Sequence, residues 1–247
     1  MDALARHIRK PARILAEAAL EAAWPTRCAL CDRPGYLICG DCRARLPYVD
    51  QNLTCSKCGA PFGFWQCTEC NEMTLKASGL NRLPLDGCVS LLRFDEQAKA
   101  IITTYKDRGE LRLAQEMAVL LTGVCHPRWP AELEAVSYIP STVQARRRRG
   151  YDHAEILARH VSEQLGLPCR GLLTRPKTYD QRALGRKERS LNMAGAFRVN
   201  PAALGKMPES VLLVDDVMTT GATLYAASAA LRKGGARRIQ GMTFARV

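Results

Sequence analysis

Residues 211–223 constrain the fold more than any other part of this sequence. Residues 211–214 are all apolar and include two β-branched valines, which predicts a buried strand. Asp215 and Asp216 follow directly, and after them come a short Thr/Gly loop and an alanine-rich segment that predicts a helix. A strand that leads through a short loop into a helix is typical of the parallel sheets of α/β proteins.

The same stretch has the chemistry to hold a sugar phosphate. Ligands of an open parallel sheet gather beyond the carboxyl ends of its strands, so a strand that ends at Val214 delivers Asp215 and Asp216 to that crevice. Carboxylates there can accept hydrogen bonds from neighbouring sugar hydroxyls. Glycine lets the backbone approach an anion, and the free amides at a helix start form a positive pole. The expected phosphate-binding residues are Thr219, Thr220, Gly221, Ala222 and Thr223.

This stretch resembles the phosphoribosyl-pyrophosphate (PRPP) signature of the type I phosphoribosyltransferases. That signature is a hydrophobic run, two acidic residues and a T-x-G-x-T-like loop, and every position of residues 211–223 fits it. The resemblance implies an α/β fold, a type I phosphoribosyltransferase-like parallel sheet flanked by helices. The alternative is an ordinary strand with an Asp-rich turn and a capped helix.

Charge and hydropathy narrow the class of partner and the compartment. The chain has 247 residues and a formal net charge of +12, which favours anionic partners such as phosphates, nucleic acid or an acidic protein face. No apolar run approaches the roughly 18 residues of a membrane span, and no secretory signal is evident. We expect a soluble, cytoplasmic protein with no transmembrane segment. Residues 1–23 predict a basic amphipathic helix, ahead of a cysteine-rich module over 24–75 and a phosphoribosyltransferase-like domain over 76–247.

The cysteines of the 24–75 module predict zinc sites. Eight of the chain's eleven cysteines form four Cys-x-x-Cys pairs, a metal-ligand spacing that also indicates a reducing compartment. Two such pairs complete the tetrahedral Cys₄ set of a structural Zn²⁺ site, so we expect two zinc ions in a double zinc ribbon. The ligands are Cys28, Cys31, Cys39, Cys42, Cys55, Cys58, Cys67 and Cys70.

The shorter gaps within each half of the module favour sequential pairing of the Cys-x-x-Cys units. Interleaved pairing, an iron–sulfur cluster and a disulfide framework are the alternatives. Phe62, Phe64 and Trp65 are expected to fill the module's small core or to dock on the neighbouring domain, and the alternative is that they stack nucleic-acid bases.

Strands and helices alternate along the larger domain, which again predicts a parallel α/β sheet. Strands are expected over residues 88–94, 135–140, 169–174, 211–215 and 238–245, and helices over 98–105, 111–124, 154–165 and 222–233.

Four consecutive arginines, residues 146–149, are expected on a loop after the strand at 135–140. Guanidinium groups suit diphosphate oxygens, and Arg146 and Arg149 are the expected pyrophosphate contacts. A solvated face or a nucleic-acid patch is the alternative. Asp152 has the spacing of a helix cap, and His153 is expected on the helix surface.

Residues 175–197 form a polar, basic stretch without apolar periodicity. A loop this long inside a compact domain is usually functional or disordered. We expect it to close over a departing pyrophosphate, with Arg175 and Lys177 stabilising the developing charge.

The whole arrangement resembles the ComF family. The resemblance is carried by the four Cys-x-x-Cys units ahead of the phosphoribosyltransferase-like domain, and by two spacings, Pro140…Arg146…Arg149-Gly150-Tyr151 and Gln181…Arg189-x-x-Asn192…Ala196-Phe197. That family is associated with DNA uptake during natural competence. The resemblance implies PRPP bound with Mg²⁺, and displacement of pyrophosphate at the ribose by a nitrogen acceptor that the sequence does not name. A non-catalytic protein that binds single-stranded DNA, or that docks on a competence helicase or DNA-import protein, is the alternative.

Overall fold

The computed structural model describes residues 25–124, 132–176 and 195–247. The chain divides into two compact units, Met1–Arg45 and Leu46–Val247. The amphipathic helix expected over residues 1–23, and Lys177 with most of the basic stretch after it, lie outside the described residues. Among those residues, no helix has the length and apolar character needed to cross a bilayer.

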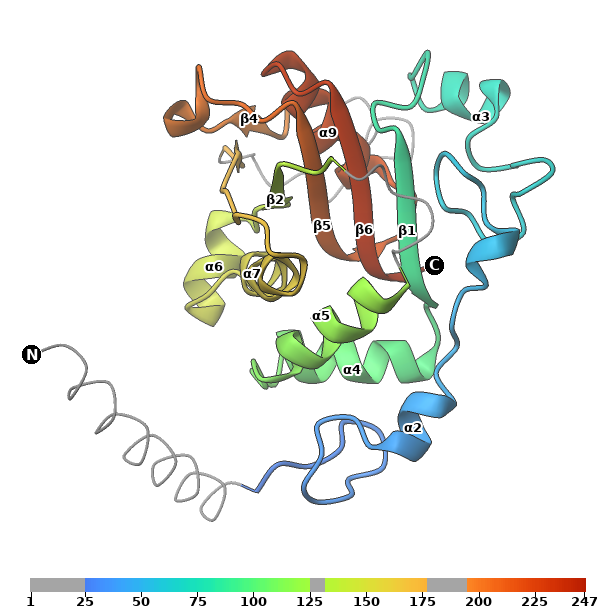
Figure 1. The fold of residues 1–247 in the computed structure, drawn as a ribbon, viewed down its shortest axis with the longest axis vertical. Helices are drawn as coiled ribbons and strands as arrows, with labels where there is room; N and C mark the ends of the chain where they lie inside the picture. The colour runs from blue at the N-terminus through green and yellow to red at the C-terminus, as the bar shows by residue number, and fades with distance from the viewer. Residues whose placement is uncertain (1–24, 125–131, 177–194) are drawn as a thin grey trace, which may run out of the picture. The chain divides into compact units, whose positions relative to one another are not determined.

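A parallel sheet forms the centre of the Leu46–Val247 unit, as predicted (Figure 1). Its strands follow one another in the order β1-β6-β5-β2, and all three pairings are parallel. The strands are nearly continuous runs of buried residues, because helices cover both faces. Their bounds are β1 Gly87–Arg93, β2 Ala135–Tyr138, β5 Ser210–Met218 and β6 Arg238–Arg246.

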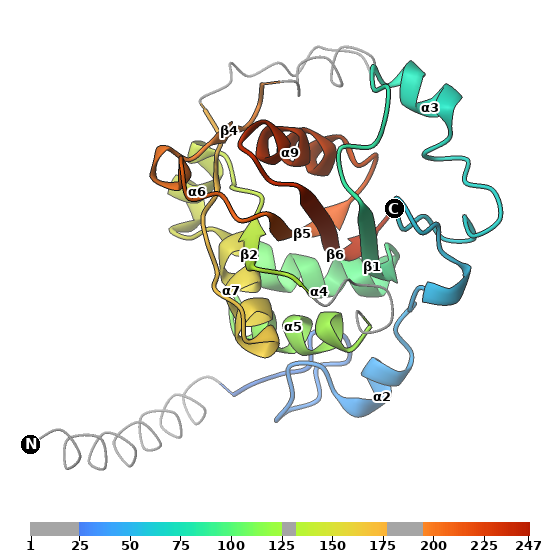
Figure 2. The ribbon, with the colours of Figure 1, turned by 45° about the horizontal axis from the view of Figure 1, so that its top comes forward.

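The helices lie in two layers (Figure 2). One face of the sheet is covered by α4 (Glu96–Lys106), α5 (Leu113–Gly123) and α7 (His153–Leu165), and the other by α9 (Ala222–Lys233). Beside α9 lies a small antiparallel sheet of β3 (Leu173–Thr174) and β4 (Arg198–Val199). The remaining short elements are α2 Gly40–Ala44, η1 Gln51–Leu53, α3 Glu72–Ala77, α6 Val143–Arg149 and η2 Pro201–Ala203.

Strand β5 is longer than the sequence predicts. Its pairing with β2 ends at Val214, opposite Tyr138, but its pairing with β6 continues to Met218, opposite Arg246. Asp215 and Asp216 therefore do not follow the strand. They lie within it, at the point where β2 has ended and one edge of β5 is open. The predicted strand, which ends at Val214 or Asp215, is too short, because β6 continues to pair with β5 at Asp215, Val217 and Met218.

The second half of the cysteine-rich segment belongs to the same compact unit as the sheet. The chain enters along β1, where Tyr48 forms a bridge with Leu92 and the Val49 amide donates to the Leu91 carbonyl at 2.9 Å. The cysteines from Cys55 onward thus follow a segment that is hydrogen-bonded to the edge of the sheet.

Candidate functional site

The eight Cys-x-x-Cys cysteines gather into two groups of four. Cys28, Cys31, Cys39 and Cys42 form one group and Cys55, Cys58, Cys67 and Cys70 the other, with the sulfur atoms of each group within 4.8 Å of one another. The sequential pairing predicted from the spacing is therefore confirmed.

Both groups fit zinc. The Sγ–Sγ distances are 3.6 Å for Cys31–Cys39, 3.6 Å for Cys55–Cys70 and 3.5 Å for Cys58–Cys67. Tetrahedral zinc with Zn–S bonds of about 2.3 Å separates its sulfur ligands by about 3.8 Å. Burial raises the pKa of the Cys55 thiol, but hydrogen bonds from the Cys58 and Lys57 backbone outweigh it and lower that pKa to about 7. Four thiolate donors leave no open coordination position, so both sites are structural.

The aromatic residues of the second zinc segment are exposed. Phe62, Phe64 and Trp65 expose 72%, 52% and 92% of their surface, so the prediction that they fill a core is wrong. The small core of this segment is made of ligand cysteines and Ala60, packed against Cys67 and Leu83. The three rings are therefore not part of this core.

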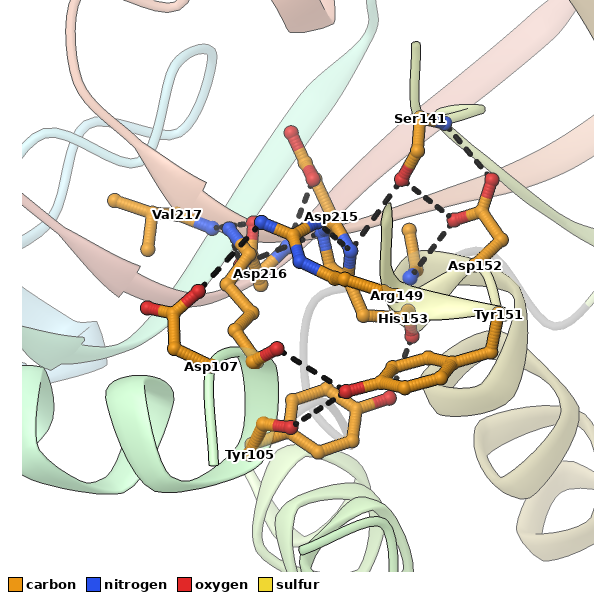
Figure 3. Close-up of polar contacts among 12 residues, drawn as sticks. Tyr105, Asp107, Ser141, Arg149, Tyr151, Asp152, His153, Asp215, Asp216 and Val217 are labelled. Carbon is orange, nitrogen blue, oxygen red and sulfur yellow. Dashed lines mark hydrogen bonds and ion pairs between the residues drawn. The ribbon is translucent and has the colours of Figure 1, made fainter. Parts of the chain in front are cut away.

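Asp215 and Asp216 are neighbours on β5, and a carboxylate oxygen of each lies within 4.8 Å of the other and of a ring nitrogen of His153. Asp216 is buried and forms an ion pair with Lys106, the last residue of α4, and its Oδ2 lies 3.7 Å from Nε2 of His153 at the start of α7 (Figure 3). Asp215 remains partly exposed, and its Oδ1 accepts from the Asp216 amide at 2.9 Å.

These surroundings move the two carboxyl pKa values in opposite directions. Burial, and then the charge of Asp216, raise the pKa of Asp215 well above its usual value. Burial also acts to raise the pKa of Asp216, but the positive charge of Lys106 outweighs it and holds that pKa below the usual value. At neutral pH the buried ion pair is therefore Asp216 with Lys106.

A second network joins α7 to the loop after β2 (Figure 3). Asp152 caps α7, as predicted, by accepting from the Ala154 amide at 3.2 Å. It also accepts from the amide and the hydroxyl of Ser141, at 2.8 and 3.0 Å. The prediction that His153 lies on the helix surface is wrong. Its ring is buried, because the first turn of α7 packs against the sheet beside Asp216, and burial lowers its pKa.

The four arginines belong to a helix, α6, and not to the predicted loop. Thr142 caps its start by accepting from the Ala145 amide, and Gly150 ends it with φ 81°. Both signals were present in the sequence, but the run of charge obscured them. Arg149 turns inward, with Nη1 3.3 Å from Nδ1 of His153 and Nη2 3.7 Å from a carboxylate oxygen of Asp107.

Arg146 and Arg147 line an open cleft of about 550 Å³ beside the end of β2. Arg175 lies on the same cleft, where its guanidinium stands 5.3 Å from the centre of the Phe197 ring. Burial lowers the pKa of Arg175, and the charge of Asp215 acts in the opposite direction, which puts the two groups within electrostatic reach. The other lining residues are Tyr138, Pro140, Ser141, Val143, Asp152, Gly171, Leu173, Thr174 and Asn200.

The turn between β5 and α9 presents donors to solvent. Thr219 and Thr220 are exposed, and Gly221 adopts φ 75°. The helix begins at Ala222, and the amides of Thr223 and Leu224 have no acceptor among the described residues. An anion at this turn would meet amides that the helix leaves free.

Sequence reasoning missed two charged residues, Lys106 and Arg246. Lys106 has no motif around it, and only the fold brings it to Asp216. Arg246 ends β6 and has no motif around it, yet it is only 2% exposed.

Comparisons with known proteins identify relatives of this chain. Residues 19–74 match the double zinc ribbon domain family. The chain is 31% identical over 215 residues to "Competence protein F" of Haemophilus influenzae, covering 82% of this chain and 93% of that protein. It is 26% identical to "Competence protein ComFC" of Bacillus subtilis, covering 87% and 86% of the two chains. Among solved structures, the glutamine PRPP amidotransferase of B. subtilis matches 54% of this chain and 25% of its own at 16% identity and a TM-score of 0.35. From its similarity to competence protein F along most of both chains, this chain belongs to the ComF family.

Proposed function

We propose that this chain binds PRPP at the open edge of β5. One observation carries the proposal: β5 brings the partly exposed carboxylate of Asp215 and the free amides at the start of α9 to the same edge of the sheet. Asp215 would accept hydrogen bonds from the ribose hydroxyls, with Asp216 completing the acidic pair. The turn formed by residues 219–223 would hold the 5′-phosphate.

The neighbouring cleft supports a place for the pyrophosphate. Arg146, Arg147 and Arg175 give it positive charge, and fork-shaped guanidinium groups match diphosphate oxygens. Mg²⁺ suits this site, because Asp215 and Asp216 offer the oxygen ligands that it prefers, and the diphosphate supplies more. When bound, it would neutralise charge on the leaving pyrophosphate. The reaction that fits is displacement of pyrophosphate from the ribose by a nitrogen nucleophile.

Membership of the ComF family supports a role in handling imported DNA. The two curated relatives carry the names of competence proteins. We extend that role to this chain, in the cytoplasm.

Titration calorimetry with PRPP and Mg²⁺ tests the proposal. We expect Asp215→Asn to weaken PRPP binding by about 10- to 100-fold, since each hydrogen bond to a charged group contributes about 1.5–3 kcal/mol. The control is Glu132→Gln, which removes an exposed carboxylate next to Arg238, near the amino ends of β2 and β6. Equal affinity of the Asp215→Asn variant and the wild type would contradict the proposal.

A second candidate function, binding of single-stranded DNA, is favoured by helix α6. Arg146, Arg147 and Arg148 are exposed, and none of them forms an ion pair within the described part of the chain. Replacing Arg147 and Arg148 with glutamine should weaken oligonucleotide binding and reduce the slope of log K against log salt by about 1.4, at about 0.7 per lost phosphate contact. Asp215→Asn should leave this binding unchanged. A DNA-import protein or helicase would then receive the strand from this helix.

A further inference from the structure

Arg246, at the end of β6, is the largest side chain that is almost fully buried in the described part of the chain. A buried guanidinium is costly unless its donors are satisfied. Its Nη1 donates to the Cys58 carbonyl at 2.6 Å, and its Nη2 pairs with Glu69. Cys58 is a ligand of the second zinc group, and Glu69 lies between its ligands Cys67 and Cys70. Arg246 therefore takes its acceptors from the second zinc segment.

The same guanidinium contacts the end of β5. Nη1 lies 3.3 Å from Sδ of Met218, and the Val247 amide donates to the Met218 carbonyl at 3.0 Å. Met218 is the last residue of β5, immediately before the turn of residues 219–221. Arg246 thus lies between the second zinc site and the start of that turn.

Met218 in turn limits the shape of the turn. A Cβ atom at Gly221 would come within 2.6 Å of Cε of Met218 and of the Tyr225 ring. Any displacement of Met218 therefore changes the space in which Gly221 and the first turn of α9 are packed. The Tyr225 amide, which donates to the Gly221 carbonyl at 2.8 Å, closes this turn.

The position of the Cys58 carbonyl depends on the metal. The buried residues of the second zinc segment are Cys55, Cys58, Cys70 and Ala60, so the ligands themselves form most of its core. A segment with so little apolar core is expected to fold only with its metal bound. Loss of zinc there would take the Cys58 carbonyl and Glu69 away from a guanidinium that cannot reach water.

We propose that Arg246 is a positioning residue that makes the order of the turn between β5 and α9 depend on zinc at the Cys55–Cys58–Cys67–Cys70 site. The first zinc site lies in the other compact unit, Met1–Arg45, and provides the matched control. The two zinc sites then have different roles, although their ligand sets are the same.

Hydrogen exchange of the zinc-loaded full chain, resolved by NMR, tests this inference without any ligand. The reporters are the amides of Tyr225 and Val247, and the reference is the Val136 amide, which donates to the Pro168 carbonyl at 3.0 Å on β2. Arg246→Met and Cys58→Ser should each speed exchange of the reporters by at least about tenfold, with the reference unchanged. Cys31→Ser should leave the reporters at the wild-type rate.

Zinc content per chain, measured with a chromogenic chelator, accompanies each variant. Cys58→Ser and Cys31→Ser should each lose one zinc ion, and Arg246→Lys, which keeps the charge, should recover part of the protection. If Arg246→Met also perturbs the reference amide, the variant Glu69→Gln is used in place of Arg246→Met. Glu69 is 42% exposed, so its charge can be removed without leaving a cavity. Combining Cys58→Ser with Arg246→Met should add little to either change alone.

The inference is overturned if Cys58→Ser loses its zinc while exchange of the reporter amides is unchanged, or if Cys31→Ser speeds their exchange equally. Since no PRPP is present, this outcome is separate from the fate of the proposed function.

Discussion

Replacing Asp216 with asparagine is expected to lower the Tm of the Leu46–Val247 unit by about 6–12 °C. The substitution leaves the ammonium group of Lys106, whose side chain is 22% exposed, without its carboxylate partner. Breaking a buried ion pair from one side costs about 3 kcal/mol or more. For a domain of this size, each kcal/mol shifts Tm by about 2–4 °C. Differential scanning calorimetry measures the change.

The control is the variant that loses both charges, Lys106→Met with Asp216→Asn. Replacing a whole buried ion pair with neutral groups is often close to neutral for stability, so most of the lost Tm should return. If the double variant melts lower than Asp216→Asn alone, the ion pair is not the cause of the loss.

Replacing the neighbouring Asp215 with asparagine should have the opposite effect on Tm. Asp215→Asn is expected to raise Tm by about 2–4 °C at pH 7, corresponding to about 1 kcal/mol. The raised pKa of Asp215 means that the folded protein resists its ionisation, and asparagine can still accept the Asp216 amide hydrogen bond now made at 2.9 Å. The same substitution is expected to abolish most PRPP affinity, so stability and binding would change in opposite directions at this position.

The pH dependence of the two variants separates them further. Folding raises the pKa of Asp215. The stability that its carboxyl contributes is therefore fully present below the unfolded pKa of about 3.9, and it is lost as pH rises through the folded pKa. The gain from Asp215→Asn should therefore grow as pH rises above about 4. The folded pKa of Asp216 is lowered, so its contribution is complete above about pH 4 and is lost only in acid. The loss from Asp216→Asn should stay flat over the same range.

The sequence predicted what short-range patterns determine. The alanine-rich segment after Gly221 became α9, with the predicted bounds of 222 and 233, because the turn and the apolar spacing act within a few residues. The zinc pairing was also predictable, since short gaps bring adjacent Cys-x-x-Cys units together.

The sequence could not predict what depends on a distant partner. Strand β5 passes Val214 because β6 continues beside it, and that pairing joins residues far apart in the chain. His153 is buried, and Lys106 reaches Asp216, because α4 and α7 cover the same face of the sheet. The different surroundings of Asp215 and Asp216 depend on Lys106, which pairs with Asp216 and which no local pattern places beside β5.

Gly59→Ala is expected to destabilise the Leu46–Val247 unit by about 3 kcal/mol or more. Gly59 has φ 72°, and a left-handed conformation costs a residue with a side chain about 1–2 kcal/mol. A Cβ atom there would also stand 2.4 Å from the Cys88 carbonyl oxygen and 3.0 Å from its carbon. These are backbone atoms of β1, hydrogen-bonded to β6, so the zinc segment must move. Calorimetry should show a Tm lowered by about 6–12 °C.

Gly166→Ala separates the two contributions to that loss. Gly166 ends α7 with φ 66°, but a Cβ atom there would meet nothing within 4 Å, so only the conformational cost of about 1–2 kcal/mol remains. The excess loss in Gly59→Ala then measures the close contact between the second zinc segment and β1. Gly59 follows the zinc ligand Cys58, whose carbonyl accepts from Arg246, so this contact and that hydrogen bond hold one knuckle against the sheet at two points. Equal losses in the two variants would mean that the segment moves freely away from β1, and zinc at that knuckle would then have no rigid path to the turn before α9.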